Sequence, residues 1–224
     1  MNGPTIEQLS SDRYELLGQM THATLADFVV EYFFRRMTWV VWLHHALSAL
    51  TLAAAIGVAA QQERGFIRGL GDFGLAFVAM LVVLLPVHEL IHAIAYRLAG
   101  AGDIRWDFSV RMMAVWVIAH RFVVDTRQFA FVALAPFVVI NAALIVSILL
   151  FPEAAVFLLF VLLWHLHGCA GDWSLLNFVW INRDRGFWTF DDDNEGRSYF
   201  FGRALPDRSS GGEGVASHHE PTPS

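Results

Sequence analysis

Four long stretches of this sequence contain almost no charged residue, and they restrict the fold more than any other feature. They cover residues 38–60, 73–96, 128–152 and 154–182. A helix needs about 20 apolar residues to cross the hydrocarbon core of a bilayer. Only 16% of the 224 residues are charged, below the ~25% that is usual in soluble domains. The sequence therefore predicts an all-α polytopic membrane protein with about four transmembrane helices.

The arginines predict how these helices are oriented. All fifteen basic residues are arginine, and only Arg64 and Arg68 lie between the first two stretches. The others lie in the N-terminal segment, the loop 97–127 or the C-terminal segment, which four crossings place on one side. Because positive charge accumulates on the cytoplasmic side of membrane proteins, we expect both termini in the cytoplasm of a multi-pass cell-membrane protein.

The same stretches divide the chain into four parts. Residues 1–37 have apolar and charged residues at helical spacing, which indicates a cytoplasmic amphipathic segment, on the membrane surface or in solvent. Residues 38–182 form the four-span membrane domain. Residues 183–208 follow as a cytoplasmic C-terminal segment. Residues 209–224 are rich in Gly, Ser and Pro and are expected to be a disordered tail.

The loop 97–127 contains a strand pattern. Apolar and polar side chains alternate from residue 104 to residue 112, which is the period of a half-buried strand. Residues 114–124 can supply a partner strand, so we expect a β-hairpin-like loop between the second and third helices.

Charge and cysteine content exclude some classes of function. The net charge is −6 and there is no dense basic block, so we expect no nucleic-acid partner. Cys169 is the only cysteine, which excludes a disulfide framework and any metal site built from several cysteines.

The second stretch contains a His-Glu-x-x-His motif. Positions four apart lie on one face of a helix, so His88 and His92 can present two imidazoles to one metal ion, here Zn²⁺. Glu89 projects about 100° around the helix, where it can take a proton from the hydrolytic water. The alternative is a glutamate that only hydrogen-bonds a histidine between helices. Pro86 lacks an N–H and is expected to kink the helix before the motif.

Two histidines need a third protein ligand, with a fourth position left for water. Glu89 and Asp172 are the only acidic residues within the four stretches. At 1.5 Å per residue, Asp172 lies about 15 Å and His88 about 13 Å from the cytoplasmic helix ends. We therefore expect Asp172 to be the third ligand. The alternative is that Asp172 is uncharged and has only a structural role.

Other polar residues in the stretches are weaker candidates. His165 and His167 are the rival third ligands, but both lie about 23–27 Å from the same helix ends. In a regular helix they are better placed to support a ligand than to bind the same ion. Asn141 and Asn177 are candidates for stabilising an oxyanion or orienting a ligand, with ordinary interhelical hydrogen bonds as the alternative.

Three of these motifs together resemble a known family. They are His-Glu-Leu-Ile-His-Ala at 88–93, Leu-Ala-Pro-Phe at 134–137 and Gly-Cys-Ala-Gly-Asp at 168–172. The combination is similar to a family of small bacterial membrane proteins described as zincin peptidases, over roughly residues 70–200. More distantly, it resembles the site-2 proteases, intramembrane zinc metalloproteases.

The resemblance implies that His88, His92 and Asp172 bind zinc and that Glu89 is the catalytic base. The sequence also departs from the site-2 proteases. Those enzymes carry Asn-Pro before the ligand aspartate and Asp-Gly at it, whereas Trp173 follows Asp172 here. These departures leave the type of substrate, and proteolysis itself, open.

The sequence therefore predicts a membrane-embedded zinc metallopeptidase acting on a membrane or membrane-associated protein or peptide. In such an enzyme an extended substrate could add to the strand at 104–112; equally, the hairpin could only cap the cavity. One alternative is a membrane di-iron oxidase or desaturase, which needs more histidines than the six in these stretches. The other is a non-proteolytic metal-binding protein, which has no need of Glu89. The oligomeric state is not indicated.

Overall fold

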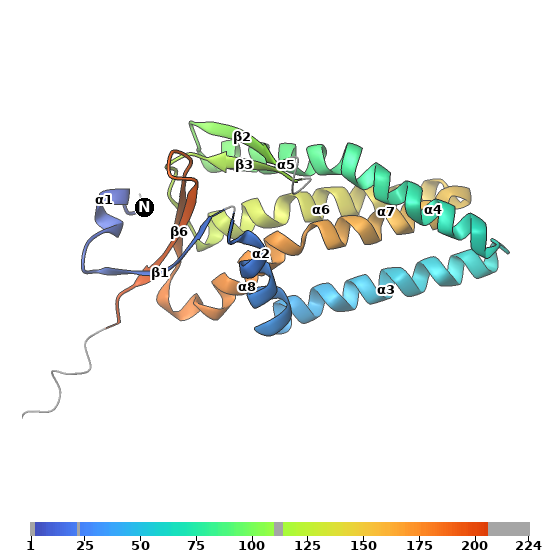
Figure 1. Cartoon of the computed structure of the whole chain (residues 1–224), viewed down its shortest axis with the longest axis horizontal. Helices are drawn as coiled ribbons and strands as arrows, with labels where there is room; N and C mark the ends of the chain where they lie inside the picture. The colour runs from blue at the N-terminus through green and yellow to red at the C-terminus, as the bar shows by residue number, and fades with distance from the viewer. Residues whose placement is uncertain (1–2, 22, 110–113, 206–224) are drawn as a thin grey trace, which may run out of the picture.

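The computed structural model describes residues 3–21, 23–109 and 114–205. The predicted tail 209–224 lies outside these residues. Long helices run side by side as a bundle, and the strands lie at one end of it (Figure 1). The long helices are α3 (Trp39–Gln61), α4 (Phe66–Ala79), α5 (Leu85–Ala99), α6 (Thr126–Leu150), α7 (Ala155–Gly168) and α8 (Ala170–Ile181).

Shorter segments complete the helical part. They are α1 (Ile6–Leu9), α2 (Leu25–Val29), the π-helices η1 (Val30–Arg35) and η2 (Met80–Leu84), and the 3₁₀ turns η3 (Pro152–Ala154) and η4 (Arg183–Arg185).

The prediction of long apolar helices is confirmed. Among the described residues, three helices are long and apolar enough to cross a membrane: α3, α6, and the continuous helix Phe66–Ala99 formed by α4, η2 and α5. A fourth span results if α7 and α8, which are bent by 46° at their junction, are counted as one. Apolar side chains such as Leu50, Val82 and Leu149 are exposed on the outside of the bundle, as is expected of helices that face lipid.

The fourth apolar stretch is broken at Cys169, where α7 ends and α8 begins. The break follows Gly168, a residue type that weakens a helix. A Cβ on Gly168 would come within 2.1 Å of the terminal methyl of Met80, so glycine lets η2 approach the bend closely. The bend places Asp172 in the first turn of α8.

The second stretch also differs from a regular helix. The sequence predicts a kink at Pro86, and the structure has the wide π-helical turn η2 just before it. Pro86 stands at the start of α5, where a missing N–H is tolerated. Wide turns of this kind inside α-helices are frequent at functional sites, and this one lies directly before His88.

The expectation of an all-α protein is confirmed only in part: the described residues are mostly helical, but they also form six strands. They are β1 (Tyr14–Thr21), β2 (Ile104–Ser109), β3 (Ala114–Ala119), β4 (Val124–Asp125), β5 (Trp188–Asp192) and β6 (Arg197–Arg203). The predicted hairpin is present as the antiparallel pair β2–β3. The other strands form an antiparallel sheet in the order β1-β6-β5-β4.

Strand β1 lies in the segment for which the sequence predicts amphipathic helical spacing. Residues 14–21 pair with β6, almost the full length of the chain away, and such a long-range pairing overrides a local helical pattern. A register shift between Leu16 and Gly18 adjusts the strand to its partner. The pairing brings the N-terminal and C-terminal segments together at one end of the bundle.

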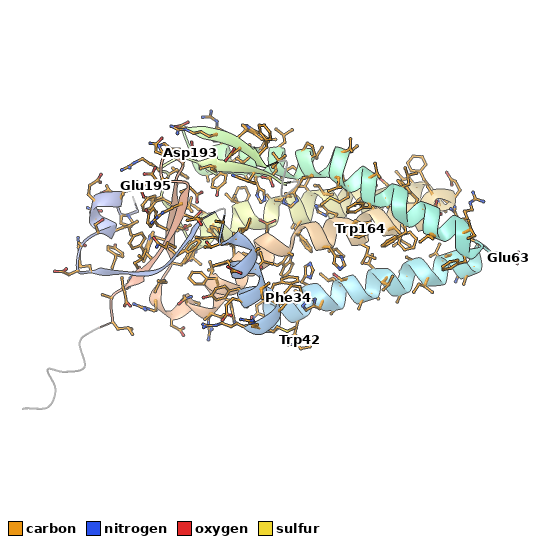
Figure 2. All side chains as sticks on the ribbon, viewed as in Figure 1. Phe34, Trp42, Glu63, Trp164, Asp193 and Glu195 are labelled. Carbon is orange, nitrogen blue, oxygen red and sulfur yellow. The ribbon has the colours of Figure 1, made fainter. Side chains whose placement is uncertain are left out.

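An aromatic core joins the sheet to the helices. Phe200 of β6 and Phe187, which directly precedes β5, pack with Phe178 of α8 and Phe129 of α6, and all four are buried. The sheet therefore has a fixed position over the ends of α6 and α8. At the opposite end, Gln62 donates to the carbonyl of Pro152 (2.8 Å) and ties two loops together. Figure 2 shows Glu63 at this end and Asp193 and Glu195 at the sheet end.

Asn177 holds the N-terminal helices against α8. Its fully buried amide donates to the carbonyls of Tyr32 (2.7 Å) and Arg36 (2.6 Å). Its Oδ1 accepts a hydrogen bond from the Thr38 hydroxyl (2.6 Å), so all of its polar atoms are used at this junction.

We expect Asn177→Leu to lower the free energy of unfolding by about 1–3 kcal/mol, because it leaves buried carbonyls without a donor. Asn182→Leu is the matched control, since the Asn182 amide bonds the Phe178 carbonyl of its own helix (2.8 Å). Thermal unfolding in detergent measures both, and equal losses would contradict the special role of Asn177.

Candidate metal centre

Helices α5 and α8 bring three donor atoms together inside the bundle. His88 Nε2 lies 3.1 Å from Asp172 Oδ2 and 3.1 Å from His92 Nε2. His92 Nε2 lies 3.3 Å from Asp172 Oδ1. Both histidines are buried, and 16% of the Asp172 side chain is exposed. These three residues are the ones that the sequence suggested as ligands, and they form one cluster.

The separations between the donor atoms of these residues are close to those around a zinc ion. Zinc bonds nitrogen and carboxylate oxygen at 2.0–2.2 Å in a tetrahedral arrangement, which separates neighbouring donor atoms by about 3.3–3.6 Å. The two imidazole nitrogens lie 3.1 Å apart, and each lies 3.1–3.3 Å from one carboxylate oxygen of Asp172, Oδ2 for His88 and Oδ1 for His92. Each separation is within a few tenths of an ångström of the value around zinc. Two imidazoles and one carboxylate are also a donor set of catalytic zinc sites.

A proline in α6 orients His92. His92 Nδ1 lies 3.0 Å from the carbonyl oxygen of Val132; the carbonyl can only accept, so the ring proton is on Nδ1. In a regular helix this carbonyl would bond the N–H of residue 136. Pro136 has no N–H and stands inside α6, which leaves the carbonyl available. His92 therefore directs the lone pair of Nε2 at the cluster.

His88 is oriented by a chain of two further side chains. Asn141 Oδ1 accepts from His165 Nδ1 (2.7 Å), so a neutral His165 has its lone pair on Nε2. His165 Nε2 lies 3.2 Å from His88 Nδ1 and can accept the proton of that nitrogen. The lone pair of His88 is then on Nε2, facing Asp172. Such hydrogen bonds behind a metal-binding histidine fix its tautomer and ring orientation.

Glu89 lies beside the cluster rather than in it. The side chain is buried, and its Oε2 accepts the backbone N–H of Val117 in β3 (3.0 Å). The hairpin therefore contributes directly to the position of this carboxylate. One carboxylate oxygen is held by the strand, and the group as a whole lines the cavity described next.

A cavity of about 260 Å³ opens from the cluster toward the sheet end of the bundle. Glu89, Asp172 and the two histidines of the motif line one side, and residues of β3, β5 and β6 line the other. Water can therefore reach groups that otherwise lie within an apolar bundle.

The hairpin is attached to the turn between β5 and β6. Arg105 donates to Asp193 (2.8 Å) and to Asp103 (2.8 Å). The hydrogen bond from Arg105 holds the pKa of the Asp103 carboxyl below its usual value. This ionic link fixes β2–β3 over the cavity.

The remaining candidates are placed differently. His165 and Asn141 lie behind His88, as described above. His167 Nδ1 contacts the carbonyl of Leu163 in its own helix (2.8 Å), and neither His167 nor Asn177 lines the cavity. Sequence reasoning did not identify Pro136 as a residue that helps to orient a ligand. What indicated it in the sequence was a proline inside a stretch without charged residues.

Comparison with known proteins identifies the central part of the chain. Residues 81–185 match the family model described as "Putative zincin peptidase". The predicted resemblance is confirmed by this match. The matched region runs from η2 through η4 and contains all three clustered donors and Glu89. No curated protein and no solved structure matches the chain significantly. The family description suggests a metallopeptidase.

The hydrogen bonds that link Asn141, His165 and His88 predict that zinc affinity depends on His165. We expect His165→Phe to weaken zinc binding about 10- to 100-fold, the range for losing a hydrogen bond behind a ligand. His167→Phe, two residues on in the same helix, should leave the affinity unchanged. Competition with a chromophoric chelator measures both variants, and equal affinities would contradict the orienting role of His165.

Proposed function

We propose that the protein is a membrane-embedded zinc metallopeptidase in which His88, His92 and Asp172 bind the metal. The convergence of these three residues, with donor atoms 3.1–3.3 Å apart in each pair, is the observation that carries the proposal. The match to a zincin peptidase family and the position of Glu89 beside the donors support it.

The chain's own residues divide the work of hydrolysis. Zinc, when bound, supplies a Lewis acid and lowers the pKa of water. Glu89 acts as the general base: it takes a proton from the attacking water and transfers it to the leaving amine nitrogen. The hydrogen bond from the Val117 N–H holds one carboxylate oxygen, so the other is available for proton transfer. Asn141 and His165 keep the ring of His88 in the orientation that binds the metal.

The alternatives lack a supporting observation. Two histidines and one carboxylate also bind mononuclear Fe(II), so elemental analysis has to distinguish the metals. A di-iron centre needs a larger set of ligands. In the described part of the chain, the groups of three close donors are this cluster and one that shares His88 with it. A purely metal-binding protein would not explain a carboxylate held beside the donors.

We further propose that the sheet end faces the cytoplasm, with both termini on that side of the cell membrane. The orientation rests on the arginines, since only Arg64 and Arg68 lie at the opposite end, in the turn between α3 and α4 and the first turn of α4. The cavity opens toward the same end. The substrate would then be a membrane or membrane-associated protein or peptide that is cut near this surface.

The edge of β3 offers a way to bind an extended substrate. One edge of β3 pairs with β2, and the Val117 N–H on the other edge points at Glu89. An extended segment that adds to this edge would run past the metal-binding side chains. The alternative is a hairpin that only covers the cavity and holds Glu89.

Metal analysis and activity together test the catalytic assignment. We expect about one zinc per chain in the wild type, the same content in Glu89→Gln, and a large loss in Asp172→Ala. Activity should fall about 10²- to 10⁴-fold in Glu89→Gln, because a general base contributes that much. The measurements are mass-spectrometric metal analysis and cleavage of single-span reporter proteins reconstituted in the same vesicles. Undiminished zinc in Asp172→Ala would refute the ligand assignment, and full activity in Glu89→Gln would refute the base.

Proline substitutions distinguish the two roles of the hairpin. Val117→Pro removes the N–H that bonds Glu89, and proline is tolerated at a free strand edge. Val115, two residues earlier, presents its N–H to the same edge without bonding Glu89. If the substrate adds to β3, both variants should lower kcat/KM at least about tenfold (one lost hydrogen bond at ~1.4 kcal/mol) and retain zinc. A loss restricted to Val117→Pro would instead favour the covering role.

A further inference from the structure

A second group of donors lies behind His88, on the side away from Asp172. It consists of His88 Nδ1, His165 Nε2 and Cys169 Sγ. The two nitrogens are 3.2 Å apart, and the sulfur lies 4.0 Å from His88 Nδ1 and 3.7 Å from His165 Nε2. All three residues are buried, His165 and Cys169 completely.

We propose that this group is a second, inner metal site for soft, thiophilic ions such as Cd²⁺ and Cu⁺. Zinc-type ions bond nitrogen at 2.0–2.1 Å and sulfur at about 2.3 Å, which separates neighbouring donors by about 3.3 Å (N to N) and 3.6 Å (N to S). The N–N separation of 3.2 Å and the shorter N–S separation of 3.7 Å lie close to these values, and the N–S separation to His88 is longer at 4.0 Å. Thiolate and imidazole ligands together select soft ions over magnesium or calcium.

The direction of the lone pairs supports an inner site. The hydrogen bond to Asn141 (2.7 Å) places the proton of His165 on Nδ1, so its Nε2 offers a lone pair to the group. In the described part of the chain, the sulfur of Cys169 has the two ring nitrogens as its polar side-chain neighbours. A metal ion here would displace the thiol proton of Cys169 to solvent and bind the thiolate.

The inner and outer sites share one residue and therefore compete. A neutral imidazole has a single lone pair. When His88 binds an inner ion through Nδ1, its proton moves to Nε2, where it is donated to Asp172 Oδ2 at 3.1 Å. The outer site then loses one of its three ligands. The inference that an inner ion inhibits hydrolysis rests on the proposed function. The inference that an ion binds at Cys169 does not depend on it.

X-ray absorption of the full-length protein in detergent, loaded with one equivalent of Cd²⁺ after removal of other metals, tests the binding. We expect a sulfur neighbour in the wild type and a stronger sulfur contribution in Asp172→Asn, which weakens only the outer site. In Cys169→Ser we expect nitrogen and oxygen neighbours alone. Size-exclusion and thermal unfolding show that each variant is folded.

Two outcomes would overturn the inner site. One is a cadmium spectrum without sulfur in both the wild type and Asp172→Asn. The other is a sulfur neighbour that persists in Cys169→Ser, which would point to a methionine such as Met80. Neither readout uses peptidase activity, so the test of the inner site is independent of the proposed function. Competition is tested by zinc release: Cd²⁺ should release zinc from the wild type at about tenfold lower concentration than from Cys169→Ser, and equal release would refute the competition.

Discussion

The structure depends on placing one carboxylate, that of Asp172, against two imidazoles inside an apolar bundle. A carboxylate removed from water without partners is costly, so its neighbours decide whether this fold is possible. The break at Cys169 turns the start of α8 toward α5, and Gly168 lets Met80 fill the bend. His88 and His92 then meet both oxygens of Asp172. A positive ion between these donors would balance the charge that the apolar surroundings cannot.

Each functional side chain is oriented by a different element. His92 is directed by a carbonyl of α6, His88 by His165 of α7, and Glu89 by an N–H of β3. Each of these hydrogen bonds fixes where a proton sits, and hence where a lone pair points. In an apolar interior there is little water to replace a lost hydrogen-bond partner. A change in packing far from the site would therefore alter the orientation of the metal-binding side chains through these hydrogen bonds. The tight contacts at Gly168 and the proline at 136 are consistent with that requirement.

The sequence predicted the candidate site best in the stretches that contain few charged residues. Because Glu89 and Asp172 are the only acidic residues in the apolar stretches, depth along the helices was enough to bring Asp172 and the motif together. The sequence suggested His165 as a residue that supports a ligand, but it could not place His165 against His88, since a straight helix separates His165 from Asp172 by about 10 Å. In the structure the helix bends between them, and the two residues contact His88 from opposite sides. The sheet was not predicted because β1 pairs with β6, which is nearly the whole chain away in sequence. A local sequence pattern does not indicate such a distant partner strand.

The cavity combines two parts of the chain that are separate in sequence. The matched family region, 81–185, supplies the clustered donors, Glu89 and the hairpin. Strands β5 and β6, which line the other side of the cavity, lie beyond that region, and β1 supports them by pairing with β6. Under the proposed function, the chemistry therefore belongs to the part shared with the family. Strands β5 and β6, which shape the opening and with it the proposed choice of substrate, lie outside the matched region.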